Sequence, residues 1–254
     1  MQLDVVDLRD FYGRPLGGVV RRLLAGRIRA RWRSTHGTQL VGLGYAVPYI
    51  GMFRGEAERL AALMPANQGA LAWPSTGKVA TALVEEAMLP LPDASVDRLL
   101  AVHCLEASER VSALLREIWR VLTPEGRLLL IAPNRRGVWA RLDTTPFGHG
   151  RPYSRAQLER LLTDALFTPL EWATALHLPP LDRPWLLRWA TAFERMGARL
   201  WPGFAGVIMV EAEKELMGAI PKTLPARRVG RLATVRGSFE REGGSPPAAL
   251  APDS

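Results

Sequence analysis

Apolar and polar positions follow two patterns along this chain of 254 residues. Short apolar runs bounded by turn residues are typical of buried strands, and apolar residues three and four positions apart are typical of helices. The spacing predicts helices at 15–25, 55–64, 108–121, 155–165 and 185–200. The runs predict strands at 39–43, 70–73, 82–84, 98–102, 127–132, 170–178 and 206–213. This alternation predicts an α/β fold with a doubly wound, mostly parallel sheet.

Turn residues refine two of these boundaries. Ser154 and Gln157 have the spacing of a capping box, which predicts a helix start at 155. Only a short stretch separates Pro74 from Glu85, and a parallel crossover usually needs a dozen or more residues. We therefore expect a shortened connection between the second and third strands, without a full helix, and a sheet edge left open for a partner to cover.

Composition bounds the domain organisation. The chain is 48% hydrophobic and has one cysteine, which allows one large core and no internal disulfide. It has no apolar run of the roughly 20 residues that a membrane span needs, and its first residues lack the pattern of a signal peptide. We expect a cytoplasmic protein with a basic helical extension at 1–36, one domain at 37–219 and a basic, disordered tail at 220–254.

The net charge of +8 is concentrated at the two ends. Residues 1–36 carry eight arginines against three acids, and residues 221–254 carry six basic residues against three acids. The basic ends could meet an anionic membrane surface or partner, or they could only keep the protein soluble. Likewise, the helix at 15–25 could pack on the domain or lie on a membrane surface or a partner.

One stretch carries more specific information than the rest. Residues 85–134 contain an acidic pair, a Leu-Pro-x-Pro-Asp turn, a strand, a Leu-Arg-Glu helix, a Pro-x-Gly turn and a strand ending in Pro-Asn. This order and spacing resemble the second half of class I S-adenosylmethionine (SAM) methyltransferases of the type 11 kind. The resemblance implies a Rossmann-like fold with SAM as cofactor. It covers residues 38–165 well and the remainder only by expected topology.

In that family the first strand and its turn hold the methionyl end of SAM, with a carboxylate and three glycines. The corresponding stretch here is residues 41–48. The family's acid is replaced by Gly42, and Gly44 alone remains of the glycines, followed by Tyr45 and Ala46. The resemblance implies that Gly42, Gly44, Tyr45 and Ala46 border the cofactor. A structural turn would explain the same residues.

In the same family, the residues that contact the adenine of SAM follow the third strand, and residues after the fourth strand face the cofactor. The register of the Leu-Pro turn places Glu85 where the family's acid accepts from the adenine amino group, with Glu86 beside it. By the same resemblance Met88 would lie against the adenine plane and His103 would line the site. Glu85 and Glu86 could instead be a solvated acidic pair, and His103 a core histidine.

A long loop after the fifth strand, residues 134–153, is the candidate substrate side. Ligands of open α/β sheets bind at the carboxyl ends of the strands, which this loop overhangs. His149 and Tyr153 are candidate catalytic residues, His149 as a base, although both could simply brace the loop. Phe11 and Tyr12 are candidates to close the site. The histidines and the single cysteine are scattered, so no metal site is expected.

Two functions remain open, because the predicted second strand also ends without the acid that holds the ribose. The first is SAM-dependent methyl transfer to a small or lipid-like acceptor. The second is a catalytically inactive relative that acts as a binding or scaffold subunit, with a protein partner at the open sheet edge. Nucleic acid is a weak third, because basic ends are its only support.

Overall fold

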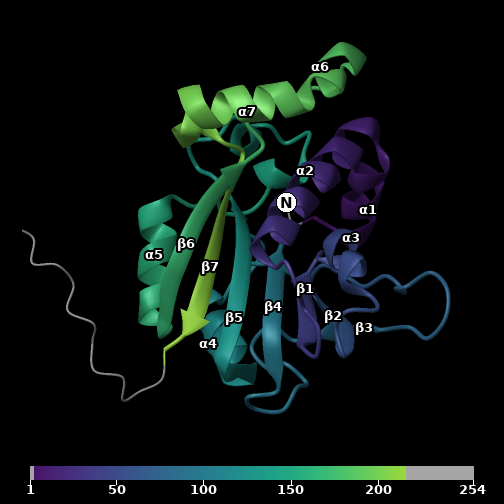
Figure 1. Cartoon of the computed structure of the whole chain (residues 1–254), viewed down its shortest axis with the longest axis vertical. Coiled ribbons are helices and arrows are strands. Elements are labelled where there is room, and N and C mark those ends of the chain that lie inside the picture. The colour runs from purple at the N-terminus through teal and green to yellow at the C-terminus, as the bar shows by residue number, and fades with distance from the viewer. Residues whose placement is uncertain (1–2, 216–254) are drawn as a thin grey trace, which may run out of the picture. The chain divides into compact units, whose positions relative to one another are not determined.

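A seven-stranded sheet forms the centre of the structure, a computed structural model that describes residues 3–215 (Figure 1). The strands lie in the order β3-β2-β1-β4-β5-β7-β6, and β7 is antiparallel to both of its neighbours. Their bounds are β1 (Gln39–Gly44), β2 (Arg59–Pro65), β3 (Thr81–Val84), β4 (Val96–Val102), β5 (Leu122–Pro133), β6 (Phe167–Ala175) and β7 (Val207–Lys214). The predicted fold class, a mostly parallel doubly wound sheet, is confirmed.

Helices cover both faces of this sheet, so each face has its own apolar core. The helices are α1 (Val5–Gly13), α2 (Pro15–Arg31), α3 (Val47–Ile50), α4 (Val111–Val121), α5 (Arg155–Asp164), α6 (Pro184–Arg188) and α7 (Ala190–Leu200). One core contains side chains of α1, α2 and α3, and the other contains those of α4 and α5. The predicted capping box of α5 is present, since Ser154 and Gln157 each bond the other's backbone.

The helix predicted at 15–25 extends to Arg31, and a separate α1 precedes it. Leu16, Val20, Leu24 and Ile28 of α2 are buried in the first core. The structure thus confirms that α2 packs on the domain, and its apolar face is not available to a membrane. The predicted tail at 220–254 lies outside the described residues.

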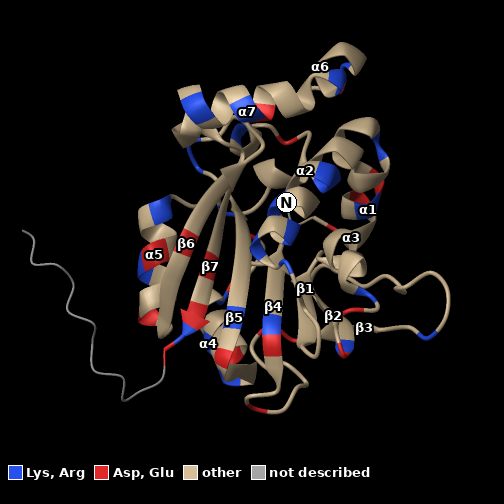
Figure 2. Cartoon of the chain, viewed as in Figure 1, with Lys and Arg blue, Asp and Glu red and all other residues tan. Residues whose placement is uncertain are grey.

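Arginines of α2 are paired with acids of the domain. Arg27 lies near Glu194 of α7 at 3.8 Å, while Arg29 and Arg31 form ion pairs with acids after α3 and on β6 and β7. Figure 2 shows the remaining basic positions on the outer side of α1 and α2. Part of the N-terminal positive charge is therefore balanced within the fold rather than free for an anionic partner.

The prediction was wrong for the second strand. Residues 59–65 form β2 between β1 and β3, where a helix at 55–64 was expected, and the strand expected at 70–73 is a loop. The sequence Leu60–Met64 consists of good helix formers, and a strand buried on both faces has no alternation to reveal it. Pairing with two neighbouring strands overrides this local preference.

The connection between β2 and β3 spans residues 66–80, and this fully described segment contains no helix. The expected absence of a helix is confirmed. The gap that suggested it was counted from the strand expected at 70–73, whereas β2 ends at Pro65. Part of this loop approaches the segment after α3, since the Trp73 ring lies 5.8 Å from the guanidinium of Arg54. On β3 itself, Leu83 is 56% exposed.

Candidate functional site

The carboxyl ends of β1, β2 and β4 bring three loops together, as the topology of a parallel sheet requires. The loop after β1 begins at Tyr45, the loop after β2 contains Gln68, and the loop after β4 begins at His103. Helix α1 lies against the second of these loops, because the backbone N–H of Val5 donates to the Gln68 carbonyl at 2.8 Å. The site is therefore built from strand ends and covered by α1.

The two glycines of the first loop are required by close packing. A Cβ on Gly42 would lie 2.8 Å from the Ala46 Cβ, and a Cβ on Gly44 would lie 2.3 Å from the Val102 carbonyl oxygen. Gly44 also has a φ of +76°, a region that glycine enters without steric cost. At position 42 there is thus no space for the carboxylate that the family places there.

Aromatic side chains cover the rest of this loop. Tyr45 and Ala46 are buried, and the Tyr12 ring of α1 stacks on the Tyr45 ring at a centroid distance of 5.5 Å. The Tyr49 hydroxyl lies 2.8 Å from that of Tyr12 and donates to it. Burial raises the pKa of both Tyr12 and Tyr49 above its ordinary value, so both phenols keep their protons.

Tyr12 also contacts a buried histidine–glutamate pair, His103 and Glu106. The Tyr12 hydroxyl lies 2.9 Å from His103 Nε2, and His103 Nδ1 lies 3.2 Å from Glu106 Oε1. Because the carboxylate can only accept, this network assigns the imidazole proton to Nδ1 and leaves Nε2 to accept from Tyr12. The four side chains form one directed chain of hydrogen bonds, from Tyr49 through Tyr12 and His103 to Glu106.

Backbone strain and an unpaired oxygen occur in the same place. His103 has a φ of +51°, which is costly for a residue with a side chain and is found disproportionately at functional sites. The second carboxylate oxygen of Glu106 is buried and has no hydrogen-bond partner among the described residues. Both residues line a cavity of about 220 Å³ that α1 and the 146–150 loop complete, and His149 also lines it.

A second cavity, of about 180 Å³, lies at the ends of β2 and β3. Glu85 and Glu86 line it together with Asn67, and Glu86 accepts hydrogen bonds from Ser108 and Asn67 at 2.6 and 3.3 Å. Met88 does not line it and is 72% exposed. The structure therefore brings the two predicted acids together and leaves Met88 at the surface.

Gln68 lines the first cavity and reaches the end of β4. Its side-chain N–H donates to the His103 carbonyl at 2.6 Å, so it bridges the ends of β2 and β4 over the end of β1. It lines the first cavity, whereas its neighbour Asn67 lines the second, and Glu109 lines both. The two cavities are thus neighbours through Glu109 and through the consecutive residues Asn67 and Gln68.

The two candidate catalytic residues of the long loop are in different surroundings. His149 Nε2 donates to the Asp143 carbonyl at 2.8 Å, which braces the loop. Tyr153 is buried, donates to the Leu105 carbonyl at 3.2 Å and lines another cavity. Burial raises the pKa of Tyr153 to about 12. Of the pair, His149 alone reaches the cavity of His103 and Glu106.

Sequence analysis missed Gln68, Glu106 and Tyr49. Gln68 was missed because β2 was placed too far along the chain, which hid the loop after its end. Glu106 could have been found, since it follows His103 by three residues just after a strand. Tyr49 gave no signal, because its role depends on contact with Tyr12, 37 residues away.

The single cysteine is expected to resist thiol reagents in the folded protein. Cys104 is buried, and burial raises the pKa of its thiol well above its ordinary value, so little reactive thiolate forms. We expect at least about a hundredfold slower labelling by iodoacetamide than in urea-unfolded protein, read by mass spectrometry. Rapid labelling under native conditions would show that the end of β4 opens readily.

Residues 3–215 contain neither a cluster of metal ligands nor a membrane-spanning helix. No group of three or more histidine, cysteine, aspartate or glutamate side chains there could hold a metal ion. No helix in that range is long and apolar enough to cross a membrane.

Part of the chain is similar in sequence to known methyltransferases. Residues 44–130 match the family model described as a methyltransferase domain. A Mycobacterium tuberculosis protein described as a probable S-adenosylmethionine-dependent methyltransferase is 37% identical over 97 residues. This match covers 37% of the present chain and 35% of the relative, so the chain spans about a third of the length of the curated relatives it matches.

Solved structures show the same fold. A SAM-dependent methyltransferase from Archaeoglobus fulgidus aligns with a TM-score of 0.57 at 16% identity, covering 76% of this chain and 94% of its own. The geranyl diphosphate C-methyltransferase of Streptomyces coelicolor aligns with a TM-score of 0.53 at 18% identity, covering 75% and 76%. The chain therefore has the fold of these SAM-dependent methyltransferases, and its residues 44–130 match the model of a methyltransferase domain.

Proposed function

We propose that this protein is a SAM-dependent methyltransferase that acts on a small or lipid-like acceptor at the cavity of His103 and Glu106. The observation that carries the proposal is the hydrogen-bonded pair of His103 and Glu106 at the end of β4, beside a cavity and next to the two acids at the end of β3.

The adenine end of SAM fits the residues present. Glu85 is exposed and lines the second cavity, where its carboxylate could accept from an amino group. Asn67 follows the end of β2, and its amide could serve the ribose hydroxyls in place of the family's acid. Gly42 and Ala46 pack against each other below the loop, so they shape the site without offering a polar group to the cofactor.

The methionyl end is covered in this conformation. Tyr12 lies on Tyr45, and Gln68 crosses from β2 to β4. Each of the two cavities is smaller than the roughly 300 Å³ at which pockets for drug-sized ligands begin. We therefore propose that α1 moves away and Gln68 turns, which joins the two spaces before the cofactor enters.

Movement of α1 would also change the chemistry of His103. When bound, SAM supplies an electrophilic methyl group. While Tyr12 donates to Nε2, that nitrogen cannot take a proton from an acceptor. Withdrawal of Tyr12 frees Nε2, and Glu106 keeps the Nδ1 proton in place and stabilises the imidazolium that forms. His149, at the edge of the same cavity, could contact the acceptor.

The hydrogen bond from Gln68 to His103 also supports a second candidate function. An inactive relative that binds a partner would need no opening, and the Gln68–His103 bond with the aromatic cover of Tyr12 would then be permanent. Its protein partner would meet the edge strand β3, where Leu83 is exposed.

Calorimetric titration of the full chain with SAM and S-adenosylhomocysteine distinguishes the two candidates. We expect SAM to bind, and Glu85→Ala to weaken binding by about tenfold or more, because a hydrogen bond to a charged group is worth roughly 1.5–3 kcal/mol. Glu159→Ala, an exposed carboxylate on α5, is the matched control and should leave affinity unchanged. Absence of SAM binding would reject the proposal in favour of the second candidate. Unchanged affinity of Glu85→Ala would reject the adenine assignment alone.

A further inference from the structure

Large apolar side chains are exposed together on the segment that connects β6 to β7. Thirteen large apolar residues are exposed in the described part of the chain, and six lie within residues 181–204. These six, with their exposed fractions, are Leu181 (51%), Trp185 (60%), Trp189 (64%), Met196 (44%), Leu200 (66%) and Phe204 (59%). We call them the α6–α7 surface. Such grouping marks an interaction site, whereas apolar residues scattered singly do not.

The α6–α7 surface is distinct from the face that holds these helices on the domain. Leu186, Ala190, Glu194 and Gly197 are buried at helical spacing, and Glu194 accepts from the backbone N–H groups of Leu176 and His177. Four of the six exposed residues recur at steps of four or seven along an adjacent face: Trp185, Trp189, Met196 and Leu200. Because the first face already anchors the helices, the second is left for another contact.

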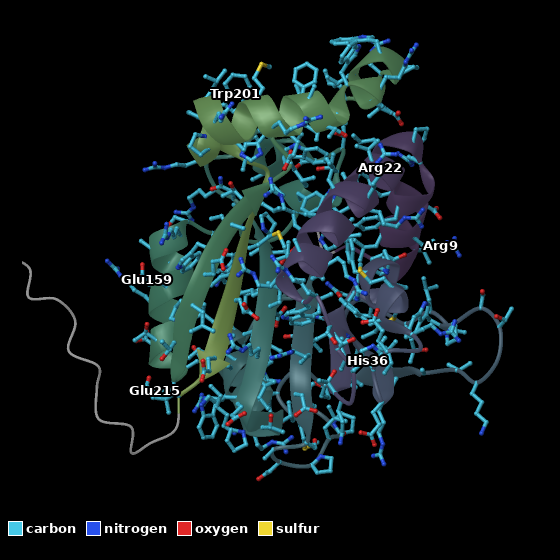
Figure 3. The ribbon with its side chains drawn as sticks, viewed as in Figure 1. Arg9, Arg22, His36, Glu159, Trp201 and Glu215 are labelled. Atoms are coloured by element: carbon cyan, nitrogen blue, oxygen red, sulfur yellow. The ribbon has the colours of Figure 1, made fainter. Side chains whose placement is uncertain are left out.

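Arginines flank the α6–α7 surface. Arg183, Arg188, Arg195 and Arg199 are all exposed. The acids of residues 181–204 are Asp182, which is exposed, and Glu194, which is buried and paired. Figure 2 shows the basic positions along α6 and α7, and Figure 3 shows that many side chains of these helices lie on the side away from the sheet. The surface is thus apolar and aromatic with a positive border.

We propose that the α6–α7 surface binds the interface of a membrane that contains anionic lipids. Tryptophan is favoured at the level of lipid headgroups, where its ring can be apolar on one side and hydrogen-bonded on the other. Arginine beside it can pair with lipid phosphates. The helices lie on the bilayer and do not cross it, in agreement with the absence of a spanning helix within residues 3–215.

Charge favours a lipid surface over a second copy of the chain. A two-fold contact through this surface would bring the arginines of both copies toward each other with one exposed acid on each side to balance them. An anionic bilayer has the complementary charge. Since β6 runs parallel to β1 and β4, the segment after it emerges at the same sheet edge as the candidate site (Figure 1). Docking would hold that edge toward the membrane, whether or not SAM binds.

The test is flotation of the full chain with vesicles of phosphatidylcholine alone or mixed with phosphatidylglycerol. We expect flotation with the anionic vesicles, less with phosphatidylcholine alone, and release as salt rises. Trp185→Ser with Trp189→Ser should weaken binding by about tenfold or more, because two aromatic rings that would be buried in the bilayer interface are removed. Arg195→Gln with Arg199→Gln should weaken it roughly thirtyfold at low salt, at about 1 kcal/mol per arginine.

The matched control is Val79→Ser with Leu83→Ser, which removes two equally exposed apolar side chains from the region of β3. Circular dichroism of each variant verifies folding, and the control should float like the unmodified chain. The proposal is overturned if the full chain does not float, or if the tryptophan and arginine variants float as well as the control. It is also overturned if sedimentation shows a dimer that the tryptophan variant abolishes while flotation is unchanged, because the surface then belongs to a second copy.

Discussion

Replacing Glu194 with alanine is expected to lower the free energy of unfolding by about 2–6 kcal/mol, because it leaves two buried backbone donors unsatisfied at about 1–3 kcal/mol each. Glu194 is 5% exposed, accepts from the backbone N–H groups of Leu176 and His177 at 3.1 and 2.8 Å, and lies 3.3 Å from His177 Nδ1. Its loss leaves these donors unsatisfied inside the fold. Urea unfolding at neutral pH measures the effect.

The same residue gives a pH dependence. Burial by itself raises the pKa of Glu194, but the hydrogen bonds from His177 and the nearby positive charge of Arg27 outweigh this effect, and the net pKa is lowered. A lowered folded-state pKa contributes stability above the unfolded pKa and loses it as pH falls through the folded value. The gap between the unmodified chain and Glu194→Ala should therefore narrow below roughly pH 4. Glu159→Ala, on the outer side of α5 (Figure 3), should change stability by less than about 0.5 kcal/mol. A similar loss in both variants would contradict the assignment.

Gly44→Ala is expected to destabilise the protein by roughly 2–5 kcal/mol, of which about 1–2 come from the left-handed backbone and about 1–3 from the contact. The added Cβ would lie 2.3 Å from the Val102 carbonyl and 2.8 Å from the Cys104 Cβ, so β1 and β4 would have to separate at their carboxyl ends.

Gly37→Ala isolates the backbone contribution. Gly37 has a φ of +68°, close to that of Gly44, and no atom lies within 4 Å of its added Cβ. It should cost about 1–2 kcal/mol, so the difference between the two variants in thermal or urea unfolding reports the close approach at the site. If both variants lost the same free energy of unfolding, the close approach of β1 to β4 at Gly44 would contribute nothing to the cost of the substitution.

The sequence was sufficient for those parts of the fold that local patterns determine. The strands near 39–43 and 98–102 were found because they are continuous apolar runs, and α5 because its capping box stands at its start. Strand β2 was not found, because Leu60–Met64 is compatible with helix or strand and only its pairing with β1 and β3 decides.

Part of the candidate site was also predictable from local patterns. Glu85, Glu86 and His103 lie at fixed distances from strand ends, so motif spacing locates them near the crevice. The contacts that close it are between distant segments: Tyr12 with His103 spans 91 residues, and Gln68 with His103 spans 35. No local pattern encodes such pairs. The roles assigned to the predicted site residues remain predictions: Gly42, Gly44, Tyr45, Ala46, Glu85, Glu86, Met88, His103, His149 and Tyr153.

The packing of α2 against the last strand has a consequence for synthesis on the ribosome. Trp32, which caps the end of α2, donates to Glu211 of β7 at 3.1 Å across 179 residues of chain, and both are buried. At translation rates of about 5–20 residues per second, α2 has to wait roughly 10–40 s for this partner to be made. During that interval the end of α2 lacks its final partner and is open to chaperones.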